Sequence, residues 1–212
     1  MSIEFRRARP ADSGPLARLH HAVLPEGVIA RFGPLFMEKV FYGVLLERED
    51  FAAYVCLQDG RFVGFIAGTT NASRLFRDAL TSRPPRVAAI VALSVLRRPW
   101  RIPGILTAVR EVVAGKPILP DVPGQIVAFG VAPECRTLDF LKATGVRIAD
   151  RLYALLMGFL RSRGVSRYKA GTVEGNTLVQ VFYAKRNATV VTTARHSGKD
   201  YLWYVGDVPA EA

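Results

Sequence analysis

Apolar and polar residues alternate with a period of two at 3–7, which is the pattern of a strand with one buried face. Two longer runs of strand-forming residues, 51–58 and 61–70, are joined by Asp59-Gly60. Asp-Gly between two runs of this kind predicts a tight β-hairpin. Runs of similar composition predict further strands, the last two joined as a second hairpin, at 124–133, 166–173, 188–195 and 199–207.

Other stretches repeat their apolar residues every three or four positions, which is the period of a helix that buries one face. These stretches are 15–23, 28–46, 145–164 and 176–187. Asp12 is expected to cap the first helix, and Gly33-Pro34 interrupts the second. Gly164 follows the last apolar turn of the third helix and is expected to end it.

The segment 71–123 follows neither period, because its helical runs are broken by several prolines. We interpret it as a helical insertion after the third strand. The predicted order is β, α, α, β, β, insertion, β, α, β, α, β, β, and a mixed sheet with helices on both faces buries such a series. The predicted fold class is therefore α/β, with one domain over 1–212, since half of the 212 residues are apolar.

The insertion carries an apolar run, 87–96, followed by a cluster of arginines and a tryptophan at Arg97, Arg98, Trp100 and Arg101. Ten apolar residues are too few to span a bilayer, which needs about 20. Three interpretations stay open: extra core or a homodimer contact, a roof over an apolar acceptor pocket, and a peripheral contact with a membrane.

The chain has 29 Lys and Arg against 18 Asp and Glu, so its formal net charge is +11 and an anionic partner is expected. A phosphorylated cofactor, a membrane surface and nucleic acid all satisfy that charge. Nucleic acid is disfavoured, because the basic residues are dispersed and form no recognised binding motif. Cys56 and Cys135 are the two cysteines, which excludes a disulfide framework and a cysteine metal site, and we expect a cytoplasmic protein.

The helix 176–187 presents two faces. Leu178, Val181 and Phe182 form one stripe, which is expected to pack on the sheet, and a neighbouring stripe carries Asn176 and Tyr183. Taken alone, these residues fit a capped core helix with an amphipathic tyrosine. They also fit a helix that contacts a ligand.

An anion site is predicted further upstream. "VAPECR", 131–136, follows a strand, and a glycine-containing basic loop, 142–147, then opens a long helix. The free N–H groups and the positive dipole end of such a helix attract anions, and phosphate is the expected ligand. Lys142, Arg147 and Arg151 add positive charge there.

At this point the chain resembles the GCN5-related N-acetyltransferase (GNAT) superfamily. The resemblance rests on the first strand and turn, the first hairpin, the V-x-P-x-x-R of 131–136, and the pattern N-x-x-A-x-x-F-Y-x-K-x-G-F. The chain carries that last pattern as "NTLVQVFYAKRNA", with Val179 in place of alanine and Asn187-Ala188 in place of Gly-Phe. The resemblance implies acyl transfer from acetyl-coenzyme A, with the thioester in a cleft between the fourth and fifth strands.

The resemblance also implies roles for single residues. Tyr183 would be the general acid that protonates the departing thiolate, which suits a phenol with a pKa of about 10. Main-chain groups near Val131 and the side chain of Asn176 would hold the pantetheine arm, and the loop 142–147 would hold the pyrophosphate. The residues assigned to coenzyme A are Phe129, Val131, Lys142, Ala143, Thr144, Gly145, Val146, Arg147, Asn176 and Lys185.

No residue is identified as the general base. His20, His21, Glu26 and Glu134 are weak candidates, and we expect a chain of water molecules to deprotonate the amine. The predicted acceptor is the primary amine of a small molecule, with amino sugars among the candidates. Two alternatives remain, a catalytically inactive regulator that binds coenzyme A and a basic protein that binds nucleic acid or a membrane surface.

Overall fold

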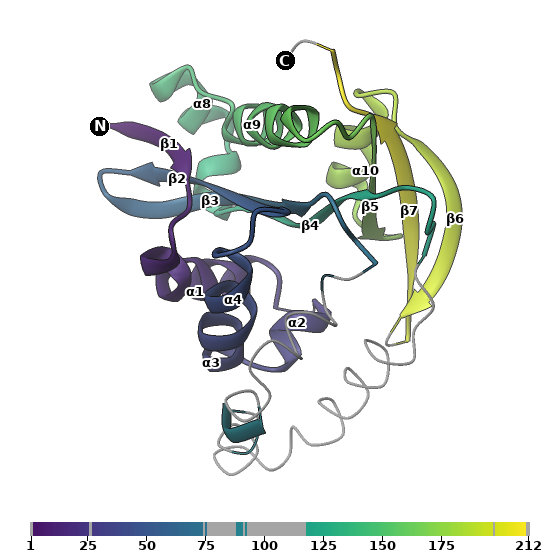
Figure 1. Ribbon diagram of the computed structural model, residues 1–212. Helices are drawn as coiled ribbons and strands as arrows, with labels where there is room; N and C mark the ends of the chain where they lie inside the picture. The colour runs from purple at the N-terminus through teal and green to yellow at the C-terminus, as the bar shows by residue number, and fades with distance from the viewer. Residues whose placement is uncertain are drawn as a thin grey trace.

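The computed structural model describes residues 2–25, 27–73, 75, 88–90, 92, 118–196 and 198–210. These residues form a seven-stranded mixed sheet with helices on both faces, as the sequence predicts (Figure 1). The strands are β1 (Ile3–Arg7), β2 (Phe51–Gln58), β3 (Arg61–Thr69), β4 (Gly124–Val131), β5 (Arg167–Val173), β6 (Thr189–His196) and β7 (Lys199–Asp207).

The strand order in the sheet is β1-β2-β3-β4-β5-β7-β6. β1 to β4 are antiparallel neighbours, β4 and β5 are parallel, and β7 pairs antiparallel with both β5 and β6. Both predicted hairpins are confirmed. At the first turn Asp59 and Gly60 have φ angles of 47° and 80°, the left-handed values that the predicted turn requires.

One face of the sheet is covered by the N-terminal helices (Figure 1). They are η1 (Pro10–Asp12), α1 (Ser13–Val23), α2 (Val28–Arg31), α3 (Pro34–Phe36), the π-helical segment η2 (Met37–Tyr42) and α4 (Gly43–Leu45). The predicted interruption at Gly33-Pro34 is confirmed, because Gly33 has a φ of 90° and separates α2 from α3. Fully buried side chains of η2, including Phe41 and Tyr42, pack in the core beneath the sheet.

The sequence predicts that Asp12 caps α1, and this prediction is wrong. The Asp12 side chain makes no capping bond to α1. Its carboxylate instead accepts two hydrogen bonds from the Arg6 guanidinium, at 2.6 and 2.9 Å, and one from the Arg9 backbone N–H at 2.7 Å. Arg6 outcompetes the helix because its guanidinium binds both carboxylate oxygens at once and carries a full positive charge, whereas a cap offers a single neutral N–H donor.

The opposite face carries η4 (Pro133–Arg136), α8 (Leu138–Thr144), α9 (Ile148–Ser162) and α10 (Thr177–Ala184) (Figure 1). The loop predicted at 142–147 is therefore wrong in its first half, which belongs to α8. That helix forms because the Thr137 side chain caps it, accepting a hydrogen bond from the Phe140 N–H at 3.2 Å. α9 packs its apolar face on β2 and β3, and Leu152, Leu156 and Met157 are fully buried there.

Of the predicted insertion, 71–123, the structure describes 71–73, 75, 88–90, 92 and 118–123, and 88–90 are helical. The arginine and tryptophan cluster lies outside the described residues, as does most of the apolar run. Among the described helices, none is long and apolar enough to cross a membrane.

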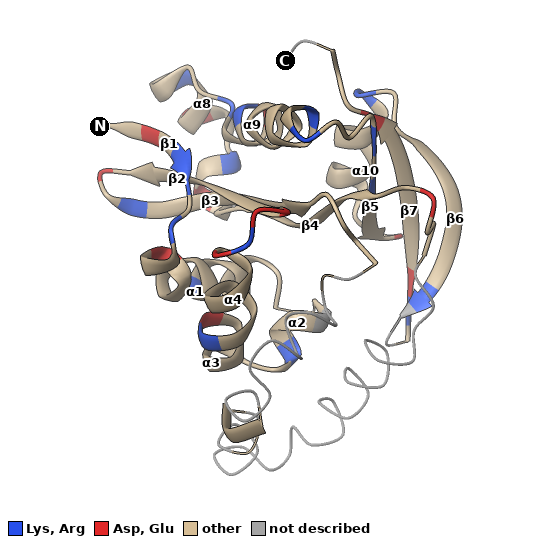
Figure 2. Cartoon of the chain, in the orientation of Figure 1, with Lys and Arg blue, Asp and Glu red and all other residues tan. Residues whose placement is uncertain are grey.

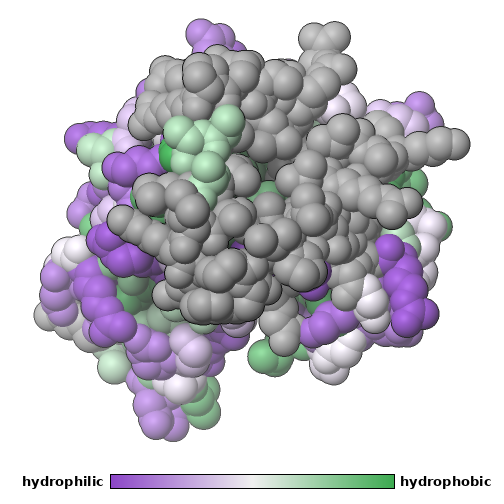
Figure 3. All heavy atoms as spheres, turned by 90° about the horizontal axis from the view of Figure 1, so that it is seen from below, coloured by the Kyte–Doolittle hydropathy of each residue, from purple (hydrophilic) through white to green (hydrophobic). Residues whose placement is uncertain are grey.

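Lys and Arg residues are spread over helices and strands rather than gathered on one face of the described chain (Figure 2). Seen from the side of α1 to α4, the coloured surface is mainly hydrophilic (Figure 3).

Candidate active site

β4 and β5 lie side by side only over their first residues. Their parallel pairing joins Gly124 to Tyr168, Gln125 to Lys169 and Ile126 to Ala170. Within the described strands, 127–131 and 171–173 have no partner in the other strand. We call this separation the β4–β5 opening. Since strands normally pair along their length, the opening leaves main-chain N–H and C=O groups of β4 available to a ligand.

A β-bulge marks the point where the opening begins. On β3, Ala67 faces Ala128 while Gly68 faces Ile126, so that Val127 is an extra residue on β4. Bulges bend a strand and increase its local twist. The bulge at Val127 therefore turns β4 away from β5 directly after their last paired residues.

Tyr183 of α10 lies beside this point. Its ring centre is 5.2 Å from that of Tyr204, and Tyr204 of β7 pairs with Ala170, the last β5 residue that is paired with β4. The Tyr183 side chain is 3% exposed. Burial raises the pKa of Tyr183 above its ordinary value, so the phenol is protonated at neutral pH. A buried proton donor thus lies where the two strands part.

The predicted packing face of α10 is confirmed for Phe182, which is half-buried and contacts Phe129 of β4. It is wrong for Leu178 and Val181, which are 75% and 47% exposed, and Tyr183 is buried in their place. The reason is aromatic packing, because the Phe182 ring contacts rings of β4 and α9 and fixes the rotation of this short helix.

An aromatic cluster lines this side of the opening. The Phe182 ring lies 5.2 Å from Phe129 of β4 and 5.7 Å from Tyr153 of α9, measured between ring centres. The Tyr153 hydroxyl donates a hydrogen bond of 3.0 Å to the Tyr168 hydroxyl of β5. Phe129, assigned to coenzyme A through the family resemblance, therefore packs against the helix that carries Tyr183.

Arg186 is a site residue that the sequence reasoning missed. Its guanidinium lies 3.5 Å from the centre of the Phe182 ring and 4.8 Å from that of Tyr153. It also donates to the Phe182 carbonyl oxygen at 2.8 Å and forms an ion pair with Asp150 of α9. Arg186 stands beside Lys185 in the sequence motif, but two of its partners, Asp150 and Tyr153, belong to the distant helix α9.

The other motif residues of α10 have structural partners. Asn176 caps the helix, with its side-chain oxygen accepting from the Val179 N–H at 3.3 Å. Asn187 has a φ of 56°, the left-handed value expected after the last turn. Lys185 is exposed at the C-cap. The cap of Asn176 uses one atom of its amide, so the amide nitrogen remains available to a ligand.

The predicted anion site lies at the start of α9. Lys142, Ala143 and Thr144 end α8, and the Gly145 N–H donates to Leu141 O at 2.7 Å. The Val146 N–H donates to the Thr144 hydroxyl oxygen at 3.1 Å. Arg147 then precedes α9, and among the described residues no side chain caps the first turn of that helix. The donors left for an anion are the N–H groups of this turn.

The main chain at the end of β4 is partly occupied. The Val131 carbonyl oxygen accepts a hydrogen bond of 2.6 Å from the Arg136 guanidinium, which is the arginine of the V-x-P-x-x-R motif. The Ala132 N–H donates to Val63 O at 2.7 Å. These bonds hold the turn that leads from the opening to α8.

Two of the four candidates for a general base, His20 and Glu134, have partners in the described structure. Buried His20 lies with its Nδ1 2.7 Å from the Tyr42 hydroxyl, and burial lowers the pKa of His20 to about 3, so the ring is neutral. Glu134 is exposed and pairs with Arg61 at 3.0 Å. Glu26 lies outside the described residues. His21, half-buried at the end of α1, follows the occupied His20.

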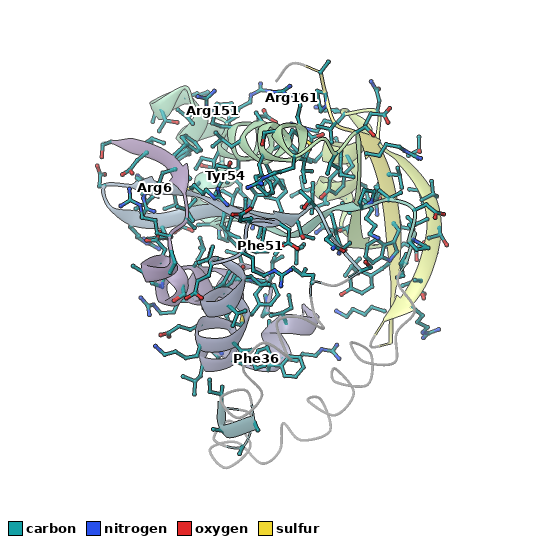
Figure 4. All side chains as sticks on the ribbon, in the orientation of Figure 1. Arg6, Phe36, Phe51, Tyr54, Arg151 and Arg161 are labelled. Atoms are coloured by element: carbon teal, nitrogen blue, oxygen red, sulfur yellow. The ribbon has the colours of Figure 1, made fainter. Side chains whose placement is uncertain are left out.

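A separate shallow hollow of about 510 Å³ lies on another side of α9. Four arginines, Arg7, Arg151, Arg161 and Arg163, line it together with Tyr54 and other residues. Figure 4 labels Arg151 and Arg161 on α9, with Tyr54 on the strand below. Of the residues predicted to hold or attract the phosphate, Arg151 lines this hollow, whereas Lys142 and Arg147 do not. Across the described part of the chain, no group of histidine, cysteine and acidic side chains is placed to hold a metal ion.

No protein-family model matches the chain, and no curated protein matches it in sequence. Solved structures do match its fold. SsHAT is 18% identical, with a TM-score of 0.63 over 99% of this chain and 100% of its own. A GNAT-family acetyltransferase from Streptococcus pneumoniae is 12% identical, with a TM-score of 0.57 over 98% and 100%. NAA60 from Arabidopsis thaliana, solved with acetyl-CoA, is 12% identical, with a TM-score of 0.57 over 97% and 98%.

Proposed function

We propose, from the fold that this protein shares with GNAT-family acetyltransferases, that it transfers an acetyl group from acetyl-coenzyme A to the primary amine of a small molecule. The observation that carries the proposal is the β4–β5 opening with the buried phenol of Tyr183 beside its first unpaired residues. A fold alone hosts many activities, whereas a proton donor at an open strand edge is specific to a site.

The open edge of β4 suits the pantetheine arm. Pantetheine contains amide groups, which can hydrogen bond to a free strand edge as a peptide strand does. Phe129 and Val131 lie on this edge, and Asn176 lies at the start of α10 with an amide nitrogen to donate. The Val131 carbonyl already accepts from Arg136, so we assign the pantetheine contacts mainly to the remaining main-chain groups of 127–131.

The first turn of α9 suits the pyrophosphate. Its N–H groups are not capped by a side chain of the described chain, and they lie at the positive end of a long helix. Arg147 and Arg151, both exposed on or beside this turn, add charge. The N–H groups of Gly145 and Val146 are engaged within the chain, so we assign the phosphate contacts to the helix start rather than to the preceding loop.

The chemistry needs a proton donor for sulfur. The neutral amine attacks the thioester carbonyl, a C–N bond forms and the C–S bond breaks. Tyr183 donates its proton to the departing sulfur, and the acylated nitrogen gives up a proton in turn. Because burial favours the neutral phenol, Tyr183 carries this proton across the whole physiological pH range.

One feature bears on the acceptor. The ring of Trp203 on β7 lies over Gly171 of β5, and its indole N–H is buried without a hydrogen-bond partner in the described structure. A buried donor of this kind is costly unless a ligand supplies an acceptor. This favours an amine that also carries hydroxyl or carbonyl oxygens, and amino sugars are the class to test first.

A second candidate is an inactive protein that binds coenzyme A as a regulator. It is favoured by the engaged N–H groups of Gly145 and Val146, which leave fewer donors for phosphate than a free loop would. For both candidate functions we propose a cytoplasmic location, where the free thiols of Cys56 and Cys135 stay reduced.

Calorimetry with coenzyme A, followed by a thiol-release assay with acetyl-coenzyme A and a panel of amines, tests the proposal. The panel contains amino sugars, polyamines, amino acids and simple alkylamines. Heat of binding together with thiol release for at least one amine supports the transferase. Binding without release for any amine supports the regulator, and the absence of binding contradicts both.

A further inference from the structure

Lys169 is a buried lysine beside the β4–β5 opening. Its side chain is on β5, next to Ala170, and the residue is 3% exposed. Its Nζ lies 2.7 Å from the Ile118 carbonyl oxygen and 2.9 Å from the Leu119 carbonyl oxygen. The described residues offer it no carboxylate partner.

This environment fits a neutral amine. A neutral lysine has two N–H donors and one lone pair, whereas an ammonium has three N–H donors and a charge to be solvated. Two carbonyl oxygens satisfy the two donors of the neutral form, and none of the described residues donates to its lone pair. Burial lowers the pKa of Lys169 to about 8, so the neutral, proton-accepting form predominates above that pH.

The two carbonyls are held in place by an unusual turn. Leu119 has a φ of 52°, a left-handed value that is uncommon for a residue other than glycine. Its carbonyl oxygen also accepts a hydrogen bond of 3.1 Å from the Val122 N–H. Backbone strain of this kind persists where surrounding structure fixes it, often at functional sites.

Lys169 and Tyr183 lie on opposite faces of the sheet at the same point of the opening. Side chains alternate along a strand, and Tyr168 bonds to Tyr153 of α9, so Lys169 points to the other face. Tyr183 lies on the α9 face, against the β7 residue that pairs with Ala170. A proton donor, Tyr183, and a proton acceptor, Lys169, thus lie on the two sides of the sheet at the β4–β5 opening.

We propose that Lys169 is the general base that accepts the proton of the acceptor ammonium. The inference rests on the proposed function. The ammonium gives one proton to Lys169, the neutral amine attacks the thioester, and Tyr183 protonates the sulfur as the C–S bond breaks. The acylated nitrogen loses a second proton, which restores the phenol. Lys169 then releases its proton to water, so the overall reaction liberates one proton.

The strand neighbours of Lys169 do not perturb this assignment. Its register partners are Gln125 on β4 and Val205 on β7, and both are uncharged. Among the described residues, burial accounts for the lowered pKa of Lys169, and no charged side chain adds to it. A pH dependence near 8 that is lost with the Lys169 side chain would therefore belong to Lys169 itself.

The first test compares the pH dependence of kcat for the wild type, Lys169→Met and Lys39→Met. Lys39 is an exposed lysine paired with Glu38 and serves as the control. We expect Lys169→Met to lower kcat by about 10²-fold or more and to remove a rising limb near pH 8, while Lys39→Met changes neither. An ionisation of the acceptor itself would persist in all three proteins.

The second test titrates Lys169 in the free protein, without turnover. Lysine labelled with ¹³Cε and ¹⁵Nζ is followed by NMR, and the Lys169 signal is assigned by its absence in Lys169→Met. A midpoint near 8 supports the inference, and a midpoint above 10 overturns it. Turnover with an unchanged limb in folded Lys169→Met also overturns it, whereas a wild type without turnover for any amine overturns the proposed function as well.

Discussion

The guanidinium of Arg186 lies 3.5 Å from the centre of the Phe182 ring, four residues earlier in the chain. The same group pairs with Asp150 in the first turn of α9. Arg186 therefore joins the end of α10 to the helix start that we assign to the pyrophosphate. Its flat, always charged group satisfies both partners at once.

Replacing Arg186 with alanine should lower the free energy of unfolding by about 1–3 kcal/mol, because a stacked and paired cation is lost. Arg186→Lys should recover only part of this, since an ammonium cannot stack as a planar group does. Urea denaturation of both variants measures the difference. Leu178→Ala on the exposed side of α10 is the control, and a lysine variant as stable as the wild type would contradict the stacking argument.

Replacing Tyr183 with phenylalanine should lower kcat by about 10²-fold or more and leave the affinity for coenzyme A unchanged, because only the proton donor is removed. Tyr54→Phe removes a phenol that lies away from the opening and should behave as the wild type. Steady-state kinetics gives kcat, and calorimetry on the same samples gives the affinity for coenzyme A. An equal loss in both variants would assign the effect to packing.

The sign of the pKa shift of Tyr183 adds a pH prediction. Burial raises its pKa, so the phenol keeps its proton through the alkaline range in which an ordinary tyrosine, with a pKa of about 10, begins to ionise. The rate should therefore show no falling limb from Tyr183 between about pH 6 and 10. A falling limb in this range that disappears in Tyr183→Phe would show that the phenol ionises and is not buried in solution.

Replacing Gly124 with alanine should lower the free energy of unfolding, whereas replacing Gly158 with alanine should raise it. A Cβ on Gly124, at the first β4–β5 pair, would lie 2.7 Å from the Arg167 carbonyl oxygen and 2.8 Å from Val165, whereas one on Gly158 of α9 meets nothing within 4 Å. Gly124→Ala should cost about 1–3 kcal/mol of unfolding free energy through overpacking. Gly158→Ala should add up to about 1 kcal/mol, because alanine favours helix more than glycine does. Denaturation curves for both variants decide the signs.

The Arg6–Asp12 pair should make stability depend on pH in acid. The Arg6 hydrogen bonds lower the pKa of Asp12 in the folded state below its unfolded value of about 3.9. The contribution of Asp12 is therefore present above pH 4 and is lost as the pH falls through the folded pKa. Asp12→Asn should lower the unfolding free energy by about 1–2 kcal/mol at pH 7. That difference should shrink towards pH 3, while exposed Asp121→Asn shows none.

Features of the fold that depend on local backbone chemistry could be predicted. Asp59-Gly60 specifies a turn through the φ angles those residues tolerate, and Gly33-Pro34 ends a helix through a missing N–H. Asp12 could not be assigned correctly, because its partner Arg6 competes with the local cap and no pattern shows which bond is stronger.

The site residues also fall into those that the sequence could identify and those that depend on distant partners. The motif residue Tyr183 could be singled out from sequence, and the structure puts it at the opening, although its role in catalysis stays a prediction. Arg186 and Lys169 could not be found, because each depends on partners from distant segments, Asp150 in one case and the 118–119 carbonyls in the other. The predicted burial of Leu178 and Val181 failed for the same reason, since the contacts of Phe182 with Phe129 and Tyr153 decide the rotation of α10.

Trp203 tests the nature of the acceptor. Its indole N–H is buried and has no hydrogen-bond partner among the described residues. Trp203→Phe removes this donor together with some apolar area, and the two effects should nearly cancel, with a change in unfolding free energy below about 1 kcal/mol. If the donor binds an oxygen of the acceptor, KM for an amino sugar should rise about tenfold, which corresponds to about 1.4 kcal/mol. KM for a simple alkylamine, which has no such oxygen, should stay the same. An equal rise for both amines would mean that Trp203 shapes the opening and does not recognise the acceptor.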